Sequence, residues 1–166
     1  MFVTAAPSRD WPETADVVTV SWPRNERSAV VGVKTISYAE NVVALRAAHE
    51  AGASEALFPN TVGHLCEGTG SNIFIVIDGE LITPPLSSGC LSGITRELIV
   101  GMFDVTEANL PIEEVNSVDE AFLSSSTRNV QAIATIDGTA LAQAPGPRTA
   151  EVAKRFELLT GHDADP

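Results

Sequence analysis

Two lysines occur in this sequence, and one of them stands where an amine could do chemistry. Lys34 ends the run SAVVGVK, residues 28–34, whose β-branched residues predict a strand. At the end of an apolar strand, desolvation would favour the neutral amine and make it a nucleophile. The commoner alternative is a strand-end lysine that is simply exposed. Lys154 lies in the amphipathic stretch 149–161 and is predicted to be a solvated charge.

A carboxylate, Glu67, stands directly before the glycine-rich turn of CEGTGSN, residues 66–72. Gly68 and Gly70 have neither the spacing of a phosphate-binding P-loop nor that of a dinucleotide fingerprint. An acid at that position would also repel a phosphate, because like charges a few ångströms apart disfavour binding. Glu67 therefore needs a role other than phosphate binding.

Two other segments could hold a phosphate. Residues 93–95 offer backbone amides at the start of a predicted helix, and the three serines 124–126 offer hydroxyls at a strand break. Each signal alone is weak, since a threonine at a helix start is commonly a structural cap. Together, a lysine, a phosphate site and an isolated carboxylate are what pyridoxal phosphate requires: a Schiff-base lysine, a phosphate cup and an acid for the pyridine nitrogen.

Short strands and three helices must position these residues. The strands are expected near residues 16–22, 28–34, 54–58, 64–67, 72–77 and 80–83, with two more within 121–138. Helices are expected over 38–51, 94–103 and 149–161, the last capped near Thr149. The dipeptides at 78–79 and 137–138 are Asp-Gly, which predicts tight hairpin turns. The order of elements is not a strict β-α-β alternation, so a mixed α+β domain with a largely antiparallel sheet is predicted.

Composition limits the kinds of partner. The chain has 166 residues, a hydrophobic content of 44% and a net charge of −12, which fit one domain that binds neither nucleic acid nor an anionic membrane. Cys66 and Cys90 do not make a disulfide framework, and no apolar run is long enough for a membrane span, so a cytoplasmic location is expected. The three histidines lie far apart, and no metal site is predicted.

The stretch EGTGSNIFIVIDGELITPPLSSGCLSGITR, residues 67–96, resembles the motif of the class IV aminotransferases. An acid, an Asn-hydrophobic-aromatic step, a threonine after a hairpin and a Gly-hydrophobic-x-basic ending recur there at the family's spacing. The resemblance extends upstream through KTISYAENVVAL and downstream through FLSSSTRNVQAIATIDG. It covers roughly residues 17–159.

This resemblance implies the fold-type IV architecture, a pseudo-barrel with flanking helices, and pyridoxal 5'-phosphate as cofactor. It implies that Lys34 is the catalytic, Schiff-base lysine and that Glu67 pairs with the ring nitrogen. Further cofactor contacts are implied for Tyr38 near the phenolic oxygen, Leu91 on the ring face, and Gly93, Ile94, Thr95, Ser125 and Ser126 around the phosphate.

The resemblance implies a small-molecule amino substrate and leaves the reaction open. The segments KTISYAENVVAL and PPLSSGCLSGITR are more similar to lyase-like members, so we expect an aminodeoxychorismate lyase that releases pyruvate and 4-aminobenzoate. A branched-chain or D-amino-acid transaminase is the alternative. A non-catalytic domain that binds a metabolite or a partner protein is the alternative of another class.

Family members carry a smaller domain ahead of the lysine, whereas 33 residues precede Lys34 here. We therefore expect residues 1–15 to be a linker remnant of a missing N-terminal domain, 16–160 to be the cofactor-binding large domain, and 161–166 to be a tail. An uncovered cofactor cleft predicts at best weak activity for the chain as given. The family's dimers imply a homodimer.

Overall fold

The computed structural model describes residues 11–162, and the expectations for residues 1–10 and 163–166 lie outside the described part of the chain. The strands are β1 (Thr14–Thr19), β2 (Glu55–Pro59), β3 (Leu65–Gly68), β4 (Asn72–Ile77), β5 (Glu80–Thr83), β6 (Thr106–Glu107), β7 (Glu120–Ser125), β8 (Asn129–Ile136) and β9 (Thr139–Ala140). The helices are α1 (Ala39–Glu50), α2 (Ile94–Met102) and α3 (Pro147–His162), with 3-10 turns at Leu86–Ser88 and Ile112–Ser117.

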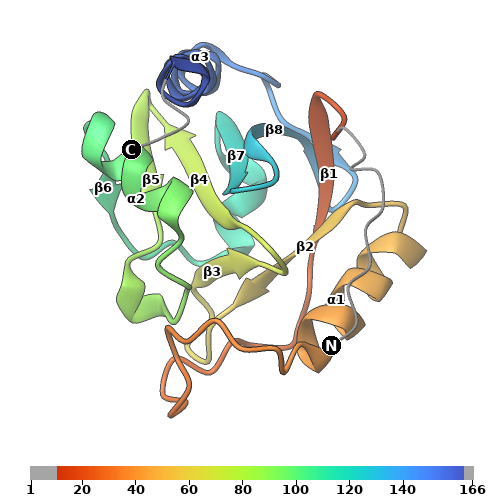
Figure 1. Ribbon diagram of the computed structural model, residues 1–166. Helices are drawn as coiled ribbons and strands as arrows, with labels where there is room; N and C mark the ends of the chain where they lie inside the picture. The colour runs from red at the N-terminus through yellow and green to blue at the C-terminus, as the bar shows by residue number, and fades with distance from the viewer. Residues whose placement is uncertain (1–10, 163–166) are drawn as a thin grey trace, which may run out of the picture.

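The nine strands form one curved sheet in the order β3-β2-β1-β8-β7-β4-β5-β6, with β9 added to β8. β1 runs parallel to both of its neighbours and β5 runs parallel to β6, while the remaining pairs are antiparallel. The sheet curls into a half-barrel with helices on its outside (Figure 1). The predicted mixed, largely antiparallel α+β architecture is confirmed.

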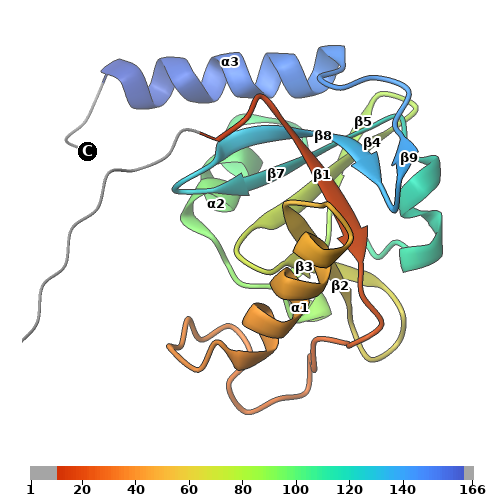
Figure 2. The ribbon, with the colours of Figure 1, turned by 90° about the vertical axis from the view of Figure 1, so that its right-hand side faces the viewer.

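Three apolar clusters pack the two sides of this sheet. The first fills the inside of the half-barrel and includes Leu57, Ile73, Ile75, Leu123 and Ile133. The second lies between the sheet and α2 and α3, where the rings of Phe74 and Phe122 stack with centroids 4.9 Å apart. The third joins α1 to β2, and Figure 2 shows α1 beside β2 and α3 lying across β7 and β8. β4 is apolar on both faces because clusters cover it on both sides.

Both Asp-Gly turns are tight, as predicted. Asp78 and Gly79 have φ angles of 52° and 80°, and Asp137 and Gly138 have φ angles of 51° and 76°. Two successive residues with positive φ are typical of the hairpin turn whose twist matches that of the strands. The first turn fixes the register of β4 against β5, which begins at Ile77 and Glu80.

The cap predicted for the last helix is wrong. α3 begins at Pro147, and Thr149 lies within its first turn. The amides of Arg148 and Thr149 donate to the Glu120 carboxylate at 3.1 and 2.8 Å. A residue of β7 therefore caps α3, and a cap supplied from 28 residues away leaves no local sequence pattern.

The strand predicted over residues 28–34 is also wrong, because this segment is a series of turns. The amide of Val31 donates to Ser28 O and that of Val33 to Val30 O, both at 3.1 Å, and Gly32 has a φ of 74°. Val30 and Val33 are 58% and 59% exposed. β-Branched residues favour a strand when a neighbouring surface packs on them, and residues 11–162 offer this segment none.

No helix within residues 11–162 combines the length and the apolar character that crossing a membrane would require.

Candidate active site

One cavity of about 830 Å³ collects every residue that the sequence predicted for the site. Its size is within the usual range for small-molecule sites. Four segments line it: the loop between β1 and α1, the β3–β4 turn, the start of α2 and the β7–β8 turn. The first of these runs below β3 in Figure 1. The predicted residues at the cavity are Lys34, Tyr38, Glu67, Leu91, Gly93, Ile94, Thr95, Ser125 and Ser126.

Glu67 is the acid of this cavity whose side chain is mostly buried, whereas that of Glu40 is exposed. Its Oε2 accepts a hydrogen bond from the Leu91 amide at 2.9 Å, and its Oε1 accepts one from Arg24 Nε at 3.1 Å. Burial raises the pKa of Glu67, while the Leu91 amide, Arg24 and Lys34 act to lower it. An anion held this way would gain from a cation placed beside it, because the cation offsets the cost of burial.

Arg24 is a cavity residue that the sequence analysis missed. Its guanidinium lies 4.2 Å from the centre of the Phe58 ring and also reaches Glu40, at 3.7 Å. Arg24 lies 43 residues from its partner Glu67, so no spacing rule points to it. It keeps the Glu67 carboxylate paired inside the cavity.

Lys34 lies on the exposed loop rather than at the end of a buried strand. The desolvation predicted from its apolar neighbours is therefore not supplied by residues 11–162. Its ammonium makes no hydrogen bond or ion pair with another residue of the described part of the chain. Nothing there engages the amine, which leaves it available to a molecule in the cavity.

The β3–β4 turn is fixed by hydrogen bonds among residues that themselves line the cavity. The Tyr38 hydroxyl donates to Thr69 O at 2.9 Å, and Asn41 Nδ2 donates to the same oxygen. The Gly68 amide donates to Ser71 O at 2.8 Å and closes the turn. A Cβ at Gly68 would overlap the Ser71 hydroxyl, so this glycine is required for packing within the turn.

The start of α2 presents backbone amides to the cavity. Gly93 is the residue before the helix, and no side chain caps it. Asn72 fixes the segment that leads into it, because Asn72 Nδ2 donates to Leu91 O at 2.8 Å. The Ile94 side chain is 75% exposed, while Thr95 is buried. An uncapped helix start has the polarity to hold an anion.

The three serines at the end of β7 and the start of the β7–β8 turn differ in their burial and hydrogen bonding. Ser124 is 1% exposed, and its Oγ makes no hydrogen bond within residues 11–162. Ser125 Oγ accepts from the Arg128 amide at 3.1 Å, and Ser126 is exposed. A buried hydroxyl without a partner at the edge of a cavity fits a polar group bound there. The free amine, the buried acid, the uncapped helix start and these hydroxyls are together a donor set that fits pyridoxal phosphate.

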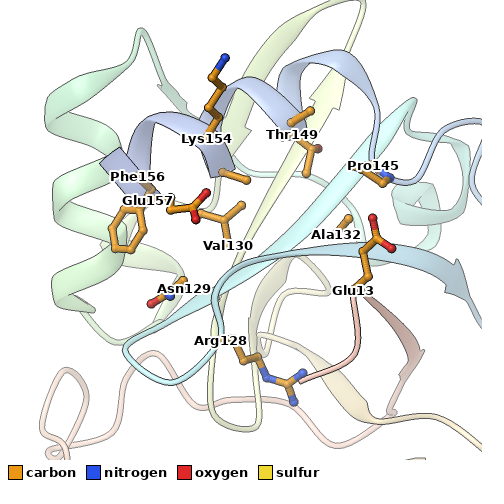
Figure 3. A pocket seen from close by; sticks show the side chains of 12 residues that line it. Glu13, Arg128, Asn129, Val130, Ala132, Pro145, Thr149, Lys154, Phe156 and Glu157 are labelled. Carbon is orange, nitrogen blue, oxygen red and sulfur yellow. The ribbon is translucent and has the colours of Figure 1, made fainter. Parts of the chain in front are cut away.

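A second cavity, of about 460 Å³, lies between β8 and α3 (Figure 3). Glu13, Arg128, Thr149, Lys154 and Glu157 are among the residues that line it. In Figure 3 the Lys154 side chain points away from the cavity toward solvent, as predicted. None of the predicted site residues reaches this cavity.

Residues 1–136 match the family described as amino-transferase class IV, so the chain belongs to the class IV aminotransferases. The resemblance inferred from residues 67–96 is thus confirmed. Among the curated proteins, the chain is 36% identical over 132 residues to the branched-chain-amino-acid aminotransferase of Pseudomonas aeruginosa, which covers 75% of this chain and 43% of that protein. It is 29% identical over 159 residues to the corresponding enzyme of Escherichia coli K12, covering 90% and 52%.

Solved structures agree with this assignment. The branched-chain amino acid aminotransferase of Thermobaculum terrenum, solved with pyridoxal phosphate, matches 91% of this chain and 52% of its own with a TM-score of 0.84 and 34% identity. A putative 4-amino-4-deoxychorismate lyase of Legionella pneumophila matches 91% of this chain and 58% of its own with a TM-score of 0.86 and 24% identity, which supports the fold alone. The chain spans about half the length of the relatives it matches.

The close approach of Gly93 to Asn72 gives a first prediction. A Cβ at Gly93 would overlap Asn72 Oδ1, whereas a Cβ at Gly101, on the exposed side of α2, would meet no atom within 4 Å. Gly93→Ala should displace Asn72 and lower the free energy of unfolding by about 1–3 kcal/mol. Gly101→Ala should raise it by up to about 1 kcal/mol, since alanine favours a helix. Urea unfolding of both variants measures these changes. Equal changes in the free energy of unfolding of the two variants would contradict the close contact between Gly93 and Asn72.

The raised pKa of Glu67 gives a second prediction. The folded protein keeps a proton on Glu67 at a pH where the unfolded chain, with an ordinary pKa of 4.5, has lost it. The stability that this proton contributes is fully present below pH 4.5 and is lost as the pH rises through the pKa of Glu67 in the folded protein. The free energy of unfolding of the wild type should therefore fall relative to that of Glu67→Gln over this interval. Urea unfolding at a series of pH values tests this, and a difference that stays flat or grows would contradict it.

Proposed function

We propose that this chain holds pyridoxal phosphate in the 830 Å³ cavity and forms the cofactor half of the active site of an amino-acid aminotransferase. The observation that carries the proposal is the convergence of nine predicted residues, from four separate segments, on one cavity. The matching Thermobaculum terrenum structure is in its pyridoxal phosphate form, and another matching branched-chain aminotransferase is complexed with a phosphopyridoxyl derivative of L-glutamate.

When bound, the cofactor supplies an electron sink for the carbon that bears the substrate amine. Side chains of this chain would supply proton transfer and the charge that stabilises the ring nitrogen. The Lys34 amine would take a proton from that carbon and return one, which its loop position and lack of a partner within residues 11–162 allow. Glu67, held by Leu91 and Arg24, keeps a cationic ring nitrogen charged.

The other residues of the cavity would hold the phosphate and orient the ring of the cofactor. The amides of Ile94 and Thr95, with the hydroxyls of Ser125 and Ser126, would bind the phosphate at the start of α2. Leu91 is half-buried in the cavity wall and would pack against a face of the ring. Tyr38, whose hydroxyl donates to Thr69 O, would lie near the phenolic oxygen of the cofactor.

A transaminase acting on branched-chain amino acids is the function supported best, because relatives that are 36% and 29% identical bear that name. The aminodeoxychorismate lyase expected from the sequence is the second candidate, favoured by its similarity in residues 34–45 and 84–96. Assays with a branched-chain amino acid plus 2-oxoglutarate, and separately with aminodeoxychorismate, distinguish them, and Lys34→Ala serves as the blank in both.

The homodimer and the cytoplasmic location stay predictions.

The two lysines of the chain provide a matched test of the cofactor assignment. Addition of pyridoxal phosphate followed by borohydride should leave one stable phosphopyridoxyl group on the wild type and on Lys154→Ala, and none on Lys34→Ala. The reason is that Lys34 lines the cavity, whereas Lys154 points to solvent from α3. Intact-protein and peptide mass spectrometry measures the adduct. A group found on Lys154, or retained in Lys34→Ala, would refute the role of Lys34.

A further inference from the structure

A buried carboxylate that belongs to neither cavity lies behind the walls of the candidate active site. Glu55 is the first residue of β2 and is 1% exposed. Its Oε1 accepts hydrogen bonds from the amide of Ala56 at 3.1 Å and from the amide and hydroxyl of Thr69, the amide at 2.9 Å. Its Oε2 accepts from Ser71 Oγ at 3.1 Å and from Arg128 Nη2 at 3.3 Å. This carboxylate is therefore fully hydrogen-bonded in the interior.

The donors to Glu55 come from two cavity walls. Thr69 and Ser71 belong to the β3–β4 turn, which follows the strand that carries Glu67. Arg128 belongs to the β7–β8 turn, and its amide donates to the hydroxyl of Ser125 at 3.1 Å. Residues 67–72 and 124–126 all line the 830 Å³ cavity. Glu55 thus connects the wall that carries the acid to the wall that carries the phosphate-side serines.

Arg128 is itself held firmly. Its guanidinium lies 3.7 Å from the centre of the Trp11 ring, and its Nη1 donates to Gln131 Oε1 at 2.5 Å. Only 9% of Arg128 is exposed. A buried ion pair costs desolvation and adds little net stability compared with apolar residues of the same size. Stability alone therefore does not account for a pair placed between two walls of one cavity.

We propose that Glu55 is a positioning residue, which together with Arg128 holds the β3–β4 and β7–β8 turns at a fixed separation and so sets the shape of the cofactor cavity. Its functional consequence rests on the cofactor site proposed above. Removing the negative charge leaves Arg128 and the turn donors facing a poorer acceptor, and both turns loosen together.

The test uses Glu55→Gln, which keeps the size of the side chain but turns an amide donor toward Arg128 or Thr69. The matched control is Glu120→Gln, another buried carboxylate, which caps α3 and touches neither turn. Amide hydrogen exchange without added ligand and the dissociation constant of pyridoxal phosphate, from its absorbance, are measured for each protein. Should Glu55→Gln fail to fold, Arg128→Lys, which keeps the charge but loses the planar fork, takes its place.

In Glu55→Gln, exchange should quicken roughly tenfold or more in residues 68–71 and also in 125–128, and the dissociation constant should rise about tenfold. In Glu120→Gln, exchange should quicken at the start of α3 and the dissociation constant should stay that of the wild type. Unchanged exchange in either turn, or equal weakening of binding by both variants, would overturn the proposal. If the wild type binds no pyridoxal phosphate, the proposed function fails, while the exchange data still decide whether Glu55 couples the turns.

Discussion

The register of β4 on β7 is the constraint on which the rest of the structure depends. It pairs Asn72 with Ser124 and Phe74 with Phe122. The second pair stacks its rings in the core under α2 and α3, and the first sets the β3–β4 turn beside the β7–β8 turn. A slip by one residue would turn each side chain to the opposite face of the sheet. The same pairing therefore secures the core and juxtaposes the two cavity walls.

Electrostatics inside the cavity follow from this placement. Glu67 is buried, with its carboxylate between the Leu91 amide and Arg24, and Lys34 lines the same cavity from a loop. The uncapped start of α2 lines the same cavity and adds positive polarity there. A ligand with a cationic ring nitrogen and a dianionic phosphate matches this distribution, with each charge next to its complement.

Much of this could be predicted from the sequence, because the signals are local. Residues 67–96 carry motif spacing, and the Asp-Gly turns and the apolar run of β4 require only neighbours in the chain. Contacts between segments far apart in the sequence could not be predicted in this way. The pairing of Arg24 with Glu67, the carboxylate of Glu55 and the cap that Glu120 gives to α3 all join distant segments. The valines near Lys34 led to a wrong strand prediction over residues 28–34 for a related reason, since strand propensity depends on a partner surface.

The central claim is that one cavity receives the phosphate at the start of α2 and the ring beside Glu67. Titration of ¹⁵N-labelled protein with pyridoxal phosphate, followed through its amide signals, tests this most directly. We expect concerted shifts of Ile94, Thr95 and Gly68, with one dissociation constant for all three. Shifts confined to the cavity between β8 and α3, around Asn129, or a ligand that moves no amide signal, would contradict it.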